Sequence, residues 1–175
     1  MTRETGLSLI TRAKPESKLF LEKGEFHHSD DSPKIILGFC RKHNIPYSKD
    51  FVSIAVYAGE EPPRGLGRCY GDLKMVLKPG RIVPDIKVIC KDDFQDLVIN
   101  AAKKEKAGLP IENYLGKIIT DLPNTFEGRY QFFLKVVREA RGKYVEARVF
   151  RQLAMVDVET LDDESFFGNL EKHLK

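Results

Sequence analysis

The chain has 175 residues, of which 42% are hydrophobic and 31% are charged, and its formal net charge is +3. This composition excludes a mainly disordered chain and predicts one folded domain over residues 1–175, while the mild charge permits an anionic ligand without requiring nucleic acid. We expect no membrane partner, because no apolar run approaches the roughly 20 residues that span a bilayer. Residues 1–18 lack the apolar stretch of a cleaved signal peptide, so we expect a chain that is cytoplasmic or exported without one.

The first quarter of the chain predicts one strand and two helices. Residues 7–12, LSLITR, have the composition of a short strand. Pro15 suits the first turn of a following helix, which we expect to end at Gly24. The Ser-Pro pair at residues 32–33 is a helix-start signal, so residues 33–44 should form the second helix. Its inward-facing stripe would contain Ile35, Ile36, Phe39 and Cys40.

The second quarter predicts three strands separated by a loop and a turn. Residues 50–58, DFVSIAVYA, are mostly apolar and read as a strand. The loop at 59–68 is rich in glycine, proline and charge, and a Pro-Gly turn at 79–80 follows the second strand. We place the second strand at 70–78 and the third at 81–90, where Pro84 indicates a sheet edge or a bulge.

The second half predicts helices at 91–108, 109–123 and 126–142, strands at 143–150 and 154–161, and a helix at 162–175. Strands and helices do not alternate regularly along the chain. This order predicts an α+β fold with a mainly antiparallel sheet, rather than a parallel βαβ fold.

Several familiar site motifs are missing or out of context. The segment 64–71, RGLGRCYG, contains GxG but lies between a loop and a strand, so it is not a dinucleotide fingerprint. His27 and His28 have no nearby acidic or cysteine partner at ligand spacing. The cysteines, at positions 40, 69 and 90, form no CxxC pair, which argues against a disulfide scaffold or a zinc site. We expect no metal cofactor.

Three polar residues lie on predicted strands. Arg12 ends the first strand, Ser53 interrupts an apolar strand, and Glu146 is the carboxylate of the alternating stretch 143–150, KYVEARVF. Alternation predicts a half-buried strand with Glu146 on the face opposite its apolar side chains. Taken singly, each residue also fits a structural role: an exposed arginine, a hydrogen-bonded serine, and a solvated glutamate paired with Arg148.

In this order the three residues resemble those of the mono-ADP-ribosyltransferases, in the branch of toxins and ecto-enzymes with an arginine–serine–glutamate triad. Residues 10–26, ITRAKPESKLFLEKGEF, resemble the first block of that family, and residues 50–58 resemble its serine-bearing strand. Residues 144–161, YVEARVFRQLAMVDVETL, are similar to the last block, which carries the catalytic glutamate. The resemblance implies one ADP-ribosyltransferase-like domain with a mainly antiparallel split sheet flanked by helices.

The resemblance also implies a reaction. The chain would move ADP-ribose from NAD, its co-substrate, to a macromolecular acceptor and release nicotinamide. Glu146 would stabilise the positive charge that develops on the ribose, and Ser53 would orient Glu146. Arg12 would bind the phosphates or ribose of NAD. Tyr57 and Tyr70 are the candidate aromatic walls for nicotinamide, and residues 138–143 would face the acceptor.

The acceptor is where this sequence departs from the family pattern. Members that modify arginine carry Gln or Glu two residues before the catalytic glutamate, and Tyr144 stands there in this chain. We favour a protein acceptor over a nucleic acid, and a bacterial toxin or effector with an immunity protein is one setting that the resemblance implies. Alternatives are an NAD glycohydrolase, a non-enzymatic module that binds protein or RNA on the same fold, and a phosphate-transferring enzyme acting on RNA ends.

Overall fold

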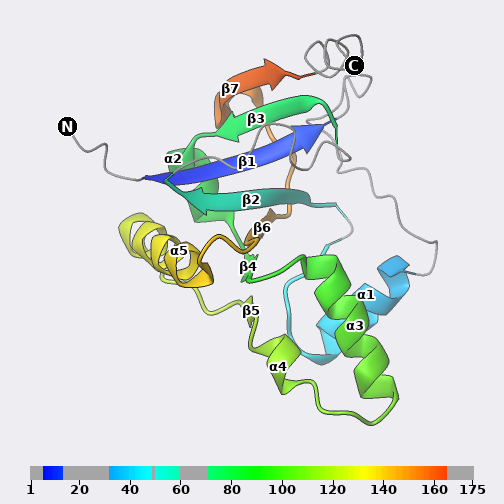
Figure 1. The fold of residues 1–175 in the computed structure, drawn as a ribbon. Helices are drawn as coiled ribbons and strands as arrows, with labels where there is room; N and C mark the ends of the chain where they lie inside the picture. The colour runs from blue at the N-terminus through cyan, green and yellow to red at the C-terminus, as the bar shows by residue number, and fades with distance from the viewer. Residues whose placement is uncertain (1–5, 14–31, 49, 60–70, 165–175) are drawn as a thin grey trace, which may run out of the picture.

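The computed structural model describes residues 6–13, 32–48, 50–59 and 71–164 (Figure 1). Seven strands in these residues form one sheet, and every pair of neighbouring strands is antiparallel. The strands are β1 (Leu7–Ala13), β2 (Val52–Ala58), β3 (Leu73–Leu77), β4 (Val88–Cys90), β5 (Ile118–Ile119), β6 (Glu146–Val149) and β7 (Val158–Asp163).

The order of the strands across the sheet is β5-β4-β6-β2-β1-β3-β7. The predicted α+β class with a mainly antiparallel sheet is therefore confirmed. All seven strands belong to one hydrogen-bonded order, so the described residues do not show two separate sheets. The long strands β1, β2 and β3 lie together, and the short strands β6, β4 and β5 follow below them in Figure 1.

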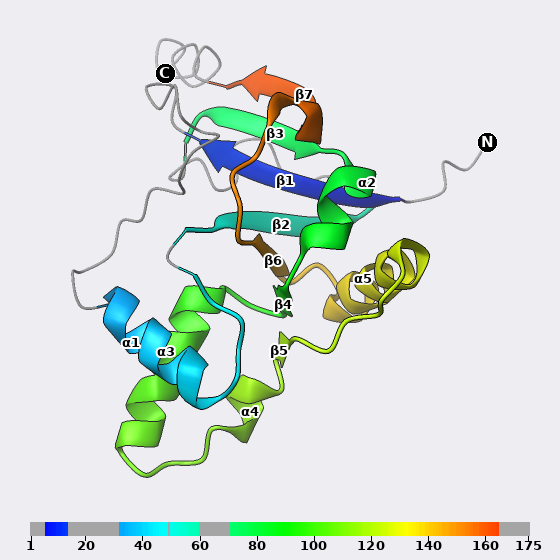
Figure 2. The ribbon, with the colours of Figure 1, turned by 180° about the vertical axis from the view of Figure 1, so that it is seen from behind.

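Five α-helices of the described residues pack around the sheet. They are α1 (Ser32–Lys42), α2 (Pro79–Ile82), α3 (Phe94–Lys106), α4 (Glu112–Leu115) and α5 (Phe126–Ala140). Figures 1 and 2 show α5 and the pair α1/α3 on different sides of β6 and β4, and Figure 2 shows α2 crossing in front of β1. Two helices begin at side-chain caps: the amide of Asp96 donates to Asp93, and that of Gly128 donates to Thr125.

Two hydrophobic clusters hold these elements. The larger cluster joins one face of the sheet to α5 and α2, and it contains Leu9, Val56, Ala147 and Phe133. The second cluster joins α1 and α3 to β4 and includes Phe94. Because successive strand residues point to opposite faces, the larger cluster fixes which face each strand residue occupies.

The predicted strand at 81–90 is wrong except for β4. Pro79 starts α2 because proline is tolerated in the first turn of a helix, where its missing N–H would have no partner. A 3₁₀ turn at Val83–Asp85 follows. Arg129 donates to the carbonyls of Val83, Pro84 and Ile86 at 3.3, 3.1 and 2.8 Å, which satisfies a backbone that no neighbouring strand pairs.

Other sequence predictions also need correction. The predicted helix at 109–123 is reduced to α4, and β5 follows it. The predicted helix at 162–175 is wrong at its start, since β7 extends to Asp163, and residues 165–175 lie outside the described residues. Ile35 was expected to face inward but is 41% exposed. The predicted helix starting at Pro15 lies outside the described residues.

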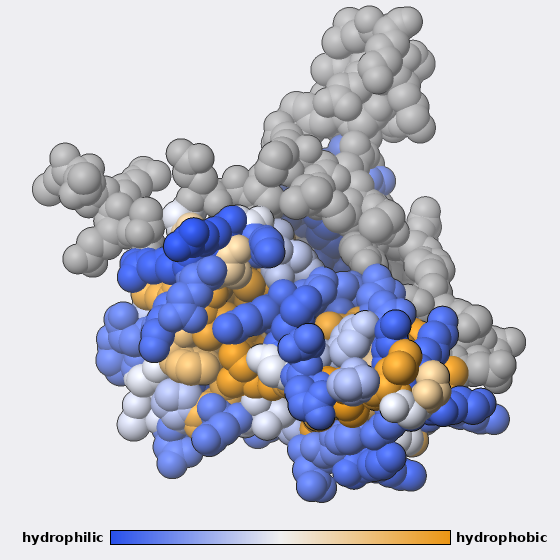
Figure 3. Space-filling view, turned by 60° about the horizontal axis from the view of Figure 1, so that its bottom comes forward, coloured by the Kyte–Doolittle hydropathy of each residue, from blue (hydrophilic) through white to orange (hydrophobic). Residues whose placement is uncertain are grey.

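The strand predicted at 143–150 is present as β6, but the prediction that it is half-buried is wrong. All four residues of β6 are buried, because the larger cluster covers one side of the strand and aromatic side chains cover the other. The face brought forward in Figure 3 shows hydrophobic residues in two areas with hydrophilic residues between them, so this view has no single continuous apolar surface. In the part of the chain that the structure describes, no helix is long and apolar enough to cross a membrane.

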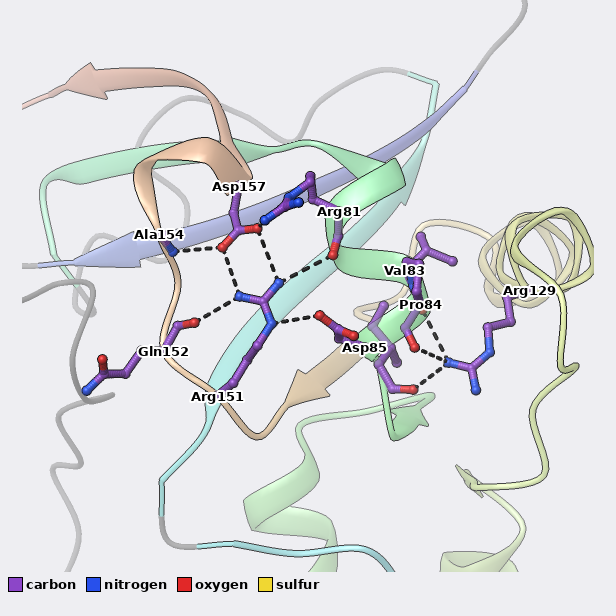
Figure 4. Close-up of polar contacts among 10 residues, drawn as sticks. Arg81, Val83, Pro84, Asp85, Arg129, Arg151, Gln152, Ala154 and Asp157 are labelled. Carbon is purple, nitrogen blue, oxygen red and sulfur yellow. Dashed lines mark hydrogen bonds and ion pairs between the residues drawn. The ribbon is translucent and has the colours of Figure 1, made fainter.

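A buried carboxylate ties the connection between β6 and β7 to α2. Asp157 is 0% exposed and accepts hydrogen bonds from the Ala154 amide at 2.7 Å, from Arg151 at 2.8 and 3.2 Å, and from Arg81 at 3.3 Å (Figure 4). Arg151 also donates to Asp85 at 2.7 Å, so one guanidinium bridges two carboxylates. The two positive charges and the amide compensate Asp157 for the loss of water.

We predict that Asp157→Asn lowers the free energy of unfolding at pH 7 by roughly 1.5–3 kcal/mol. Burial alone would raise the pKa of Asp157, but the hydrogen bonds from Arg151 and Ala154 and the positive charges lower it overall below its ordinary value of 3.8. A lowered pKa stabilises the fold fully above the ordinary value, and that stabilisation is lost as the pH falls through the folded value. The difference between wild type and Asp157→Asn should therefore shrink below pH 3.8 in urea titrations.

Asp85→Asn is the matched control, because Asp85 binds the same arginine but its side chain is 46% exposed. Asp85→Asn should lower the free energy of unfolding by less than about 1 kcal/mol. A cost equal to that of Asp157→Asn, or a cost of Asp157→Asn that does not change with pH, would contradict this account of the network.

Candidate active site

Arg12, Ser53 and Glu146 lie on the same face of three adjacent strands. Leu9 is directly opposite Val56, and both belong to the larger cluster, so Arg12 and Ser53, an odd number of residues away, point to the other face. Glu146 does so too, because its neighbour Ala147 is in that cluster. Extending the β1–β2 register by two residues places Arg12 opposite Ser53.

Glu146 is held by three donors from three elements. Its Oε1 accepts the hydroxyl of Ser53 at 2.5 Å, from β2. Its Oε2 accepts the backbone amide of Phe94, the first residue of α3, at 3.2 Å and Nε of Arg148 at 3.0 Å. The side chain is about 4% exposed, so these protein groups replace water around the carboxylate.

Burial raises the pKa of Glu146, and this effect exceeds the opposing effects of the Arg148 charge and the Ser53 hydrogen bond. The negative charge of Asp93, next to the start of α3, adds to the rise. A buried carboxylate with a raised pKa and a specific charged partner is a common feature of catalytic sites, and it also occurs in structural ion pairs.

Arg148 is the part of the site that sequence reasoning underestimated. The structural alternative for Glu146 is a solvated pair with Arg148, but the pair is buried, and the Arg148 side chain is 3% exposed. Its guanidinium carbon lies 3.7 Å from the ring centroid of Phe51 and 4.2 Å from that of Phe94. The i, i+2 spacing on a strand placed the two charges on one face, but nothing local indicated that two phenylalanine rings would cover them.

Arg12 forms a bidentate ion pair with Glu164. Nη1 and Nη2 each lie 3.2 Å from a carboxylate oxygen, and the side chains are 9% and 2% exposed. The pair connects the end of β1 to the residue after β7. Sequence reasoning missed Glu164 because it assigned residues 162–175 to a helix.

Of the two tyrosines predicted to contact nicotinamide, one lies within the described residues. Tyr57 is half-buried on the same face as Ser53. Burial raises the pKa of Tyr57, and the charge of Arg12 opposes the rise, which puts the phenol within electrostatic reach of that arginine. Tyr70, the other predicted wall for nicotinamide, lies outside the described residues, as do His27, His28 and Cys69.

The two described cysteines are poor nucleophile candidates. Cys40 and Cys90 are buried, and burial raises the pKa of each thiol to about 12. A thiol with such a pKa is almost wholly protonated at neutral pH, whereas nucleophilic cysteines act as thiolates. Among the residues that the structure describes, no group of three potential ligands is arranged to hold a metal ion.

Comparisons with protein-family models, with curated proteins and with solved structures find no match to this chain. A strip of half-buried side chains, including Ser53 and Tyr57, runs along β2 beside the buried Glu146. A ligand that reached this strip would meet a hydroxyl, a phenol and, behind the hydroxyl, a carboxylate.

We predict that Arg12→Gln and Glu164→Gln each lower the free energy of unfolding by about 3 kcal/mol, because each removes one member of a bidentate ion pair that is little exposed to solvent. The double variant should cost clearly less than the sum of the two. Lys117→Gln is the control at an exposed ion pair, since the side chains of Lys117 and its partner Asp92 are 49% and 51% exposed. It should lower the free energy of unfolding by less than about 1 kcal/mol. Additive losses for Arg12 and Glu164 would show that the two side chains are not coupled.

Proposed function

We propose that this chain is an NAD-dependent ADP-ribosyltransferase with an ADP-ribosyltransferase-like fold, and that Glu146, Ser53 and Arg12 form its reaction centre. The observation that carries the proposal is the 2.5 Å hydrogen bond from Ser53 to Glu146, with Arg12 opposite Ser53 on the next strand. Three residues far apart in the sequence thus lie on one face of adjacent strands, which supports the roles proposed for them.

The chemistry suits a fixed carboxylate. When the bond between nicotinamide and ribose breaks, nicotinamide leaves with the bonding electrons and positive charge develops on the ribose. A carboxylate near the ribose 2′-hydroxyl stabilises that charge, most strongly where water is excluded and the carboxylate is already oriented. The three donors on Glu146 provide such orientation. The acceptor then forms a bond to the ribose carbon that nicotinamide has left.

Arg12 and Tyr57 supply the remaining contacts in this proposal. A guanidinium binds phosphate or ribose oxygens through the same paired N–H groups that now face Glu164, so NAD would exchange with that carboxylate at Arg12. Tyr57 lies on the same face and offers an aromatic ring, with Tyr70 as the second candidate wall. No step of this reaction requires a metal ion.

In this proposal the acceptor binds next to the residues that precede Glu146. Residues 138–143 run from the end of α5 toward β6, and the following Tyr144 is 37% exposed. We favour a protein acceptor, while water as acceptor would make the chain an NAD glycohydrolase. The setting of a bacterial toxin or effector with an immunity protein, cytoplasmic or exported without a cleaved signal, belongs to the same proposal.

A non-enzymatic role is the second candidate, and a specific observation favours it. Glu146 is buried and the Arg12 side chain is only 9% exposed, and both are paired with protein charges, Arg148 and Glu164. Under this alternative the two ion pairs only stabilise the fold, and the face would serve to bind protein or RNA. Measurement of NAD cleavage separates the two candidates.

We predict that the purified chain releases nicotinamide from NAD, and that Glu146→Gln lowers the rate by about 10²–10³ because the developing charge loses its carboxylate. Glu105→Gln is the matched control. Glu105 is also an ion-paired glutamate, bound to Lys42 at 3.0 Å and His43 at 2.8 Å, but it lies near the far end of α3. Its substitution should leave the rate unchanged.

Labelled NAD added to cell lysate with the chain identifies the acceptor. Label on protein supports transfer, and free ADP-ribose without labelled macromolecules supports the glycohydrolase. Circular dichroism of Glu146→Gln must show a folded protein for the comparison to count. Absence of NAD turnover with lysate present, or equal rates for folded wild type and Glu146→Gln, would remove the enzyme proposal.

A further inference from the structure

Burying the charged Arg148 side chain costs desolvation free energy that its contacts do not fully offset. Its side chain is 3% exposed, yet Nη1 has no hydrogen-bond partner; this atom is the one such buried side-chain nitrogen or oxygen in the described part of the chain. Leaving a buried donor unpaired is unfavourable, and burying a charge pair costs more desolvation than a well-packed apolar pair would. Stability alone would therefore favour apolar residues at positions 146 and 148.

The two phenylalanine rings around Arg148 also indicate that stability alone does not require a charge at this position. The guanidinium lies between the rings of Phe51 and Phe94, at 3.7 and 4.2 Å from their centroids. Cation–π attraction stabilises a charge in this position, but an apolar side chain would also fill the space between two rings. The rings fix the plane of the guanidinium, and its Nε then points at Glu146. Groups that depart from the most stable arrangement are expected at functional sites.

The two oxygens of Glu146 are held differently. Oε2 is bound by the charged Nε of Arg148 and by the backbone amide of Phe94, neither of which can rotate away easily. Oε1 is bound by the neutral hydroxyl of Ser53, which is half-buried and can turn about a single bond. A carboxylate oxygen can accept two hydrogen bonds, so a ribose hydroxyl could bind Oε1 beside Ser53 without disturbing Oε2.

We infer that Arg148 is the positioning residue of this site: it anchors Oε2 of Glu146, so that Oε1 is directed toward Ser53 and the ribose. The inference rests on the proposed function. Arg148 acts through Glu146 and touches neither NAD nor the acceptor in this account. Its position two residues after Glu146 on β6 places both side chains on one face, directly beside Ser53 on β2.

The other groups near the pair do not replace Arg148. Asp93, before α3, carries a negative charge that disfavours ionisation of Glu146. Cys90 lies opposite Glu146 on β4, and Cys40 on α1 and Tyr47 lie within electrostatic reach of Arg148. Burial raises the pKa of these three groups, so they stay neutral at neutral pH. Arg148 is thus the cation that contacts this carboxylate among the described residues.

The test is a pH titration of the Glu146 carboxyl carbon by ¹³C NMR, with no NAD present. In Arg148→Met the midpoint should rise by about 1–3 pH units relative to wild type, because the positive neighbour is gone. Arg148→Lys, which retains a charge but not the planar fork, should show a smaller rise. Arg151→Met removes an arginine bound to a different buried carboxylate, Asp157, and should leave the Glu146 midpoint unchanged.

The second measurement is the pH dependence of NAD cleavage by the same variants. The acid limb of the pH profile of kcat for NAD cleavage should move up with the Glu146 midpoint in Arg148→Met, while KM for NAD stays unchanged. Arg148→Lys should recover part of the shift. If Arg148→Met does not fold, Arg148→Lys and Arg148→Gln carry the comparison.

An unchanged Glu146 midpoint in folded Arg148 variants overturns the inference, as does a shift of the same size in Arg151→Met. A loss of kcat in Arg148→Met with an unchanged pH profile also overturns it, because a purely structural role would produce that result. If the midpoint shifts as expected but wild type cleaves no NAD, the proposed function fails while the hold of Arg148 on Glu146 stands.

Discussion

The buried carboxylate of Glu146 is the interaction on which the centre of this structure depends. Its three hydrogen bonds join β2, β6 and the first turn of α3, and so connect the larger hydrophobic cluster to the cluster around α1 and α3. A carboxylate can be buried here because an amide at a helix start, a hydroxyl and a guanidinium replace its water. The same groups would give the carboxylate a fixed direction toward a ligand.

Because side chains alternate between the two faces of the sheet, apolar residues gather on one face and charged residues on the other. The residues of β1, β2 and β6 that belong to the larger cluster are apolar, and Arg12, Ser53, Glu146 and Arg148 lie on the other face. Both arginines of that face form ion pairs with little solvent exposure, and they lie on either side of Ser53, on β1 and β6. Both arginines are thereby held by carboxylates inside the protein.

Local patterns explain how much the sequence could predict. The strands carrying Arg12, Ser53 and Glu146 follow from composition and alternation, and the helix α3 follows from its Asp93 cap and lysine-rich end. The strand expected at 81–90 fails because Pro79, Pro84 and the long-range contacts of Arg129 decide its path. The burial of Arg148 and its clamp between Phe51 and Phe94, like the pairing of Arg12 with Glu164, depend on residues distant in the chain. No local pattern contains that information.

The most direct test of the central claim, that NAD binds and reacts on the Ser53 face of the sheet, is amide NMR of the labelled chain titrated with NAD. Our account predicts shifts concentrated on β1, β2 and β6 around Arg12, Ser53, Tyr57 and Glu146, with α5 and the far end of α3 unchanged, followed by the appearance of free nicotinamide in the same sample. Shifts confined to other elements, or none at millimolar NAD, would contradict it.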